Sequence, residues 1–227
     1  MSLSDLMEMA GFTIRRYEAR DYVAVREIFA AGMSEHVPAA CVHMLSQTWA
    51  RLVLLTVFVG LLVSSQSLLL ALLALTLILA AGQQIVTFSW SRYIKETINT
   101  DLLDIEQSYM ARADSCFWVA ECQGLVVGTV GARPSEQCRQ DLELKRLSVR
   151  RDFRQRGIAK ALCHTVIGLA RARGLQAVVL GTSMLQVEAQ KLYEKLGFQL
   201  QREVIIPQLL GKLTNFRISM YRFRIAS

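Results

Sequence analysis

Apolar and polar residues follow two periods along this chain, and each period predicts its own kind of element. Alternation rich in β-branched and aromatic residues predicts strands over 12–17, 116–122, 125–130, 142–149, 176–180, about 198–206 and about 216–225. Apolar residues three and four positions apart predict helices over 21–31, about 100–110, 157–173 and 187–196. Strands and helices in this order are typical of an α/β fold with a mixed sheet.

One stretch follows neither period, because it contains no charged residue and no histidine. It spans residues 52–91, and its apolar parts, 52–63 and 68–82, are separated by a Ser-Ser-Gln-Ser cluster. As one helix, these 40 residues would extend about 60 Å, twice the roughly 30 Å of a bilayer's hydrocarbon core. The segment therefore has the character of a membrane insert, either one tilted crossing or a helical hairpin with the Ser/Gln cluster at its tip.

The position of this segment in the α/β pattern favours the hairpin. The first predicted strand and helix precede it, whereas all the other predicted strands follow it. If all these elements share one domain, both ends of the segment must emerge on the same side of the membrane. We therefore predict three parts: residues 1–51 begin the soluble domain, residues 52–91 form a membrane-embedded hairpin, and residues 92–227 complete the domain.

Composition and charge agree with an anchored soluble domain. Hydrophobic residues make up 52% of the chain, yet all of the 26 Lys and Arg and 19 Asp and Glu side chains lie outside the uncharged segment. The net charge is −1 over residues 1–51 and +8 over residues 92–227, and the positive-inside tendency then predicts that the domain lies in the cytosol. The basic excess lacks a zinc-finger spacing or a stripe of interleaved aromatics, so membrane lipid is an expected partner and nucleic acid is not.

Cysteine and histidine usage gives no sign of a metal centre. The five cysteines are odd in number and show no CxxC spacing, which predicts reduced thiols. The three histidines are scattered along the chain, and we expect structural roles for them. We therefore predict no metal cofactor.

The residues with the clearest chemistry lie between the strand over 142–149 and the helix over 157–173. Small residues, Gly157 and Ala159, open the helix, and five cations surround that point: Arg150, Arg151, Arg154, Arg156 and Lys160. Small residues let a ligand approach the backbone, and the unpaired N–H groups of a helix start attract anions. The pattern predicts a diphosphate site, although it is neither a Walker A loop nor a GxGxxG dinucleotide motif.

Two motifs in order resemble the GNAT superfamily of N-acetyltransferases. They are V-x-x-x-x-R-Q-R-G-I-A-K-A-L over residues 149–162 and Q-V-E-A-Q-K-L-Y-E-K-L-G-F over residues 186–198. The resemblance covers residues 12–35 and about 100–225. The insert, with S-C-F-W-V-A-E over residues 115–121, is similar to one branch, the membrane-bound camello-like N-acetyltransferases. This implies a GNAT fold, with a mixed central sheet and flanking helices, interrupted by the membrane-embedded hairpin.

The resemblance also implies roles for individual residues. Backbone groups of Leu147 and Val149 would pair with the pantetheine arm of acetyl-CoA, and Gln186 stands where many members contact that arm through Asn. Tyr193 would protonate the departing thiolate, and Glu143 falls where some members keep a carboxylate base. The diphosphate would be held by Arg154, Gln155, Arg156, Gly157, Ile158, Ala159 and Lys160. From the residues alone, Glu143 is equally well a surface strand residue. Tyr193 could be a core aromatic, but the Gly197-Phe198 pair that follows it favours the acid role.

The activity to expect is acetyl transfer from acetyl-CoA to an amine at the endoplasmic reticulum membrane, on its cytosolic face. By resemblance, the first acceptor is the free α-amine of a small molecule, with cysteine S-conjugates foremost. Acetylation of lysine Nε atoms in membrane or secretory proteins is the alternative, and a catalytically silent, membrane-bound interaction module is the third possibility. The oligomeric state is left open.

Overall fold

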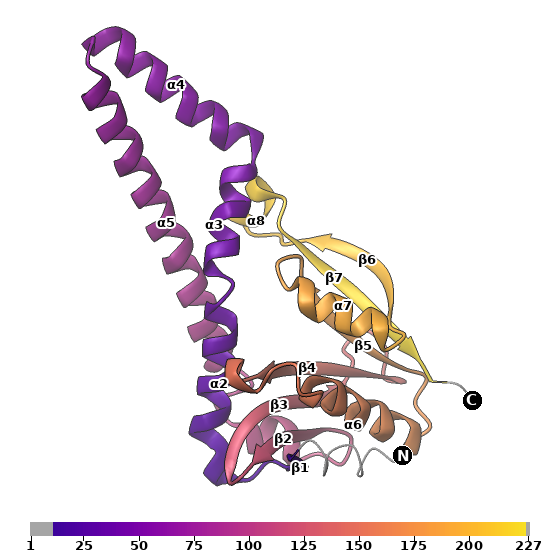
Figure 1. The fold of residues 1–227 in the computed structure, drawn as a ribbon. Helices are drawn as coiled ribbons and strands as arrows, with labels where there is room; N and C mark the ends of the chain where they lie inside the picture. The colour runs from indigo at the N-terminus through magenta and orange to yellow at the C-terminus, as the bar shows by residue number, and fades with distance from the viewer. Residues whose placement is uncertain (1–10, 226–227) are drawn as a thin grey trace.

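A seven-stranded sheet with strand order β1-β2-β3-β4-β5-β7-β6 forms the centre of the computed structural model, which describes residues 11–225 (Figure 1). Its strands are β1 (Thr13–Arg16), β2 (Cys116–Cys122), β3 (Leu125–Pro134), β4 (Asp141–Val149), β5 (Ala177–Ser183), β6 (Gln199–Ile205) and β7 (Arg217–Arg224). All neighbouring strands are antiparallel except β4 and β5, which are parallel. The mixed sheet predicted from the sequence is therefore confirmed.

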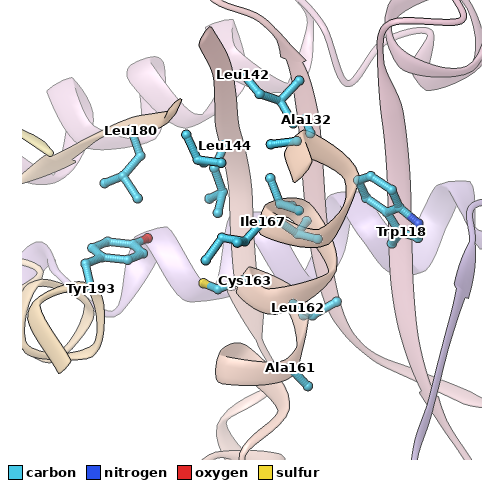
Figure 2. Packing of buried hydrophobic residues seen from close by; sticks show 14 of the residues in the cluster. Trp118, Ala132, Leu142, Leu144, Ala161, Leu162, Cys163, Ile167, Leu180 and Tyr193 are labelled. Carbon is cyan, nitrogen blue, oxygen red and sulfur yellow. The ribbon is translucent and has the colours of Figure 1, made fainter. Parts of the chain in front are cut away.

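Helices cover both faces of this sheet. The helices of the described residues are α2 (Tyr22–Ser34), α3 (Val37–Ser46), α4 (Thr48–Ser65), α5 (Leu68–Ile98), α6 (Ile158–Ala172), α7 (Val187–Lys195) and α8 (Leu209–Thr214). On one face, α6 and α7 pack around Leu144, Leu162 and Leu180 (Figure 2). On the other face, α2 and the segment over 102–110 pack around Phe29 and Phe117. Each face thus buries its own apolar cluster, which fixes the sheet between two helical layers.

α4 and α5 form a helical hairpin that projects away from the sheet (Figure 1). They meet at Gln66, whose left-handed backbone (φ 54°) ends α4, and Ser67 caps α5 by accepting from the Leu70 N–H at 3.4 Å. Both helices are long and apolar enough to cross a membrane, and only 6% and 11% of their most apolar windows are buried within the protein. Because β1 pairs with β2, both ends of the hairpin return to one sheet. The helices extend past the predicted limits of the insert.

The prediction of a helix over about 100–110 was wrong. Residues 99–103 form turns, and only Glu106–Met110 are helical, as a short π-helical turn. Asp101, at the start of the predicted helix, turns its carboxylate to the guanidinium of Arg146. A long-range ion pair has here overridden a local helix signal. Two short helices, α3 and α8, were not predicted.

The strand β4 contains the two irregularities that shape the site. Its pairing with β5 covers only Asp141, Leu142 and Glu143, and beyond these residues the register between the two strands ends. Its pairing with β3 is interrupted by a bulge, at which Arg146 adopts a left-handed backbone (φ 57°). A bulge bends the strand that carries it. The second half of β4, up to Val149, therefore diverges from β5 and leaves an open edge.

Candidate active site

The start of α6 lies just beyond the point where β4 ends. Gly157 precedes the helix with φ +80°, and a side chain added there would meet no atom within 4 Å. Gln155, two residues earlier, also has a left-handed backbone (φ 64°). The loop thus turns sharply and leaves open space over the first N–H groups of α6, which is the arrangement that an anionic group binds. Ile158 is buried in the core, so it anchors the helix start and leaves the space above Gly157 to a ligand.

The basic side chains of this loop are held in different ways. Arg154 forms a two-point ion pair with Glu35, from Nη1 to Oε2 at 2.6 Å and from Nη2 to Oε1 at 2.9 Å, and its Nε donates to the Val149 carbonyl at 3.1 Å. Arg156 lies over the Phe153 ring, 4.8 Å from the ring centroid, and donates to the Asp152 carbonyl. The Arg154 guanidinium, by hydrogen bonding and charge, lowers the pKa of the Glu35 carboxyl. Sequence reasoning missed Glu35.

The last turn of α2 lies across the region where β4 and β5 separate. A Cβ at Gly32 would lie 3.4 Å from the Ser148 Oγ of β4, and the Met33 sulfur lies 4.0 Å from the Gln186 Nε2 at the start of α7. The Gln186 Oε1 accepts from the Thr182 hydroxyl at 3.0 Å. The end of α2 therefore faces both β4, the strand expected to bind the pantetheine arm, and Gln186. The side-chain carbonyl of Gln186 already accepts a hydrogen bond from Thr182, four residues earlier.

Tyr193 lies on α7 and is buried in the core cluster with only 6% of its surface exposed. Its ring packs against Phe198 and Tyr221, and its hydroxyl points toward α6 near Cys163 and Ile167 (Figure 2). Burial, together with Cys163, raises the pKa of the Tyr193 phenol far above its usual value. Among the hydrogen bonds of the described residues, none involves this hydroxyl. The raised pKa keeps this phenol protonated near neutral pH, which is the state that a general acid requires.

Glu143 faces away from Tyr193's helical layer, into a hollow of about 450 Å³. Its carboxylate lies 3.3 Å from Lys145 Nζ and 3.5 Å from Arg133 Nε. Leu180, which also lines this hollow, lies beside Tyr193 in Figure 2. Glu143, the last residue of β4 that pairs with β5, and Tyr193 thus lie on opposite sides of the sheet.

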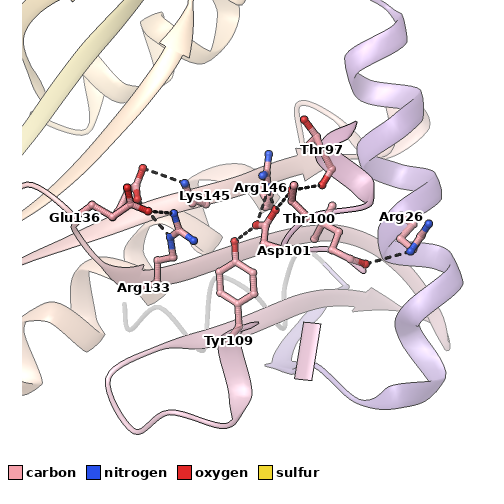
Figure 3. A network of polar contacts seen from close by, with 11 residues as sticks. Arg26, Thr97, Thr100, Asp101, Tyr109, Arg133, Glu136, Lys145 and Arg146 are labelled. Atoms are coloured by element: carbon pink, nitrogen blue, oxygen red, sulfur yellow. Dashed lines mark hydrogen bonds and ion pairs between the residues drawn. The ribbon is translucent and has the colours of Figure 1, made fainter. Parts of the chain in front are cut away.

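A buried polar network supports the bulge of β4 (Figure 3). The Arg146 guanidinium donates to Asp101 through Nη2 at 2.6 Å and Nε at 2.9 Å, and Tyr109 donates its hydroxyl to the same carboxylate. Burial works to raise the pKa of Asp101, but the hydrogen bond and charge of Arg146 outweigh it and lower that pKa overall. One sequence signal did mark the bulge: apolar positions on β4 shift from Leu142 and Leu144 to Leu147 and Val149.

The comparisons with known proteins agree with this geometry. The model of the Acetyltransferase (GNAT) family matches residues 83–198. The chain is 42% identical over 219 residues to "Probable N-acetyltransferase camello" of Xenopus tropicalis, covering 96% of this chain and all of that protein. This chain is a camello-type member of the GNAT acetyltransferases. N-acetyltransferase 8 of Rattus norvegicus is also 42% identical, over 84% of this chain and 87% of its own length.

Solved GNAT structures share the fold. An acetyltransferase of the GNAT family from Staphylococcus aureus superimposes with a TM-score of 0.56 at 17% identity, covering 95% of this chain and 99% of its own. A protein from Salmonella typhimurium described as an acetyltransferase, with its cofactor acetyl-CoA, gives a TM-score of 0.52 at 15% identity over 96% of this chain and 95% of its own. The family resemblance read from the motifs, the fold class and the enzyme class are confirmed. The roles of the individual site residues stay predictions.

Proposed function

We propose that this camello-type acetyltransferase moves the acetyl group of acetyl-CoA to the α-amine of a small acceptor with an apolar substituent, such as a cysteine S-conjugate. The observation that carries the proposal is the arrangement around the diverging strands β4 and β5. The open start of α6 lies at the end of β4, and the hollow containing Glu143 lies where the two strands separate.

The residues of this region fit the coenzyme. Its diphosphate would lie against the open start of α6, with charge supplied by the cations of the loop. Its extended pantetheine arm would add to the unpaired edge of β4 through backbone groups of Leu147 and Val149, as a peptide strand adds to a sheet edge. The predicted loop contacts, Arg154, Gln155, Arg156, Gly157, Ile158, Ala159 and Lys160, are consecutive in the chain, and Gln186 faces the same region from the start of α7.

Acetyl-CoA supplies an acetyl thioester, and the chain's own residues manage two protons. The acceptor nitrogen forms a bond to the acetyl carbon as the carbon–sulfur bond breaks. Glu143 would take the proton that leaves the amine, directly or through water, and Tyr193 would give a proton to the departing sulfur. An α-amine with a pKa near 8 is neutral in about one molecule of ten at pH 7, whereas a lysine near 10.4 is neutral in about one of 2,500. Glu143, a single carboxylate that is partly paired with cations, is therefore better suited to deprotonate an α-amine than a lysine side chain.

The hairpin would hold this reaction at the endoplasmic reticulum membrane, with the catalytic domain on the cytosolic face. Its support is the exposure of α4 and α5, whose apolar side chains face outward along most of both helices. Exposing such a surface to water would be unfavourable, whereas lipid tails would solvate it. Acceptors with apolar substituents partition toward the same membrane, which raises their concentration near the site.

An acceptor panel tests the proposed activity. Purified protein in detergent or lipid nanodiscs is incubated with acetyl-CoA and S-benzylcysteine, aspartate or a lysine peptide, and release of free thiol is followed. We expect S-benzylcysteine to be acetylated with the highest kcat/KM. Preferential acetylation of the lysine peptide would support the alternative function. Calorimetry with acetyl-CoA alone separates an enzyme from a silent module, because a silent module would give no binding heat.

Labelling of tags in selectively permeabilised cells tests the membrane arrangement. With only the plasma membrane permeabilised, tags at both ends of the chain should be accessible to antibody. Access to one tag only would contradict the hairpin, and protection of both would place the catalytic domain in the lumen.

A further inference from the structure

The hollow beside Glu143 contains more charge than a general-base site requires. It is lined by strands β4 to β7 and by the loop between β3 and β4, and three acidic and three basic side chains lie on its wall: Glu136, Asp141, Glu143, Lys145, Arg202 and Arg222. Apolar residues complete the wall, among them Val179, Leu180 and Met220. The arrangement of these charges indicates what the hollow can bind.

Five of the six charged residues have a partner of opposite charge. Asp141 forms a two-point pair with Arg222. Glu143 lies 3.3 Å from Lys145, and Glu136 accepts from Arg133 at 2.7 Å. Arg202 is the exception: among the ion pairs of the described residues it has none, and its Nη2 contacts only the neutral Gln137 amide oxygen, at 3.3 Å.

A backbone irregularity turns Arg202 toward the hollow. In β6, the register with β7 shifts between Leu200, which faces Tyr221, and Arg202, which faces Met220. Because of this shift, Gln201 is the extra residue of β6, and Arg202 lies beside Met220, which also lines the hollow. Bulges of this kind occur next to active sites, where they change the direction of a side chain.

We infer that Arg202 binds the carboxylate of the acceptor. The inference rests on the proposed function and names the residue that selects its substrate. A planar guanidinium matches a carboxylate at two points, and Arg202 has no carboxylate of its own to release. Glu143 then receives the amine of the same molecule, and the apolar side chains of Val179 and Met220 receive its substituent.

The test compares two acceptors that differ only in this carboxylate, S-benzylcysteine and S-benzylcysteamine. For the wild type and each variant, we divide the kcat/KM for S-benzylcysteine by the kcat/KM for S-benzylcysteamine. Comparing this ratio between enzymes cancels the difference in amine pKa between the two acceptors. A charge-assisted hydrogen-bond pair is worth about 1.5–3 kcal/mol, so Arg202→Gln should lower the ratio roughly 10- to 150-fold, mainly through the carboxylate acceptor. Arg202→Lys should restore part of the loss, since it keeps the charge but not the planar fork.

Arg139→Gln is the matched control, because it removes an exposed arginine from the neighbouring loop outside the hollow. Its ratio should equal that of the wild type. Calorimetric affinity for acetyl-CoA verifies that each variant is folded. If Arg202→Gln acetylates both acceptors with the wild-type ratio, the inference is wrong and the proposed function stands. If the wild type acetylates neither acceptor, the proposed function fails and the inference fails with it.

Discussion

Glu35 and Arg154, 119 residues apart in the chain, hold each other in a two-point ion pair across the site. Glu35 follows the last residue of α2, and Arg154 begins the loop that precedes α6. The pair therefore connects the element that leads into the hairpin with the expected diphosphate site. It also neutralises one of the cations that this site offers to an anion.

Glu35→Gln should strengthen coenzyme binding. Without the Glu35 carboxylate, the charge of Arg154 is free to act on the diphosphate. A partly exposed ion pair is worth up to about 1 kcal/mol, so we expect the Kd for acetyl-CoA to fall about 2- to 5-fold. The effect should shrink at high salt. Calorimetry measures it, and Glu27→Gln, which removes an exposed carboxylate on α2, is the control. Weaker binding by Glu35→Gln would mean that the pair positions Arg154 for the coenzyme.

The double variant Arg156→Glu, Gly157→Asp should abolish coenzyme binding while the protein stays folded. It places two acidic groups at a helix start that favours anions, and we expect at least a roughly 100-fold loss of acetyl-CoA affinity. Because Gly157 has φ +80°, the substitution also costs about 1 kcal/mol, or a Tm roughly 2–4 °C lower. Arg224→Glu, an exposed site at the end of β7, controls for the charge reversal at Arg156. Unchanged affinity would reject the diphosphate assignment.

Tyr193→Phe should lower turnover without changing coenzyme affinity. Loss of a general acid typically costs a factor of roughly 100 or more in rate, whereas the ring itself is kept in the core. Since burial raises the pKa of Tyr193, the phenol stays protonated through neutral and mildly alkaline pH, and its ionisation should add no falling limb to the wild-type rate between pH 6 and 9. Tyr17→Phe, buried in the other apolar cluster, is the control. Equal turnover would assign Tyr193 to the core alone.

The sequence predicted those parts of the site whose signals are local. A strand, a basic loop and a small-residue helix start follow each other directly over residues 142–162, and the structure has them in that order. The partners Glu35, Asp101 and Arg202 were not predicted. Each acts through a residue far away in the chain or through a bulge, and neither a helical nor a strand period encodes which distant charges will meet. Around Asp101, the local pattern predicted a helix, whereas the structure has turns and a long-range ion pair with Arg146.

Asp101→Asn should destabilise the protein more than the loss of a surface pair. The Asp101 and Arg146 side chains are only 10% and 17% exposed, and breaking a buried pair leaves one charge uncompensated, at a cost of about 3 kcal/mol. For a chain of this size we expect a Tm roughly 6–12 °C lower in detergent. Asp114→Asn is the matched control, since Asp114 pairs with Arg112 at the surface and its loss should change the Tm by about 4 °C or less. Equal shifts for both variants would contradict the burial argument.

The same carboxylate predicts how stability depends on pH. Because Arg146 lowers the pKa of Asp101 below its usual 3.8, folding favours the ionised form. The stabilisation is complete above about pH 4 and is lost as the pH falls through the lowered, folded-state pKa. The Tm difference between wild type and Asp101→Asn should therefore stay constant from pH 5 to 8 and shrink below about pH 4. A difference that stays constant down to pH 2 would show that folding does not lower the pKa of this carboxyl.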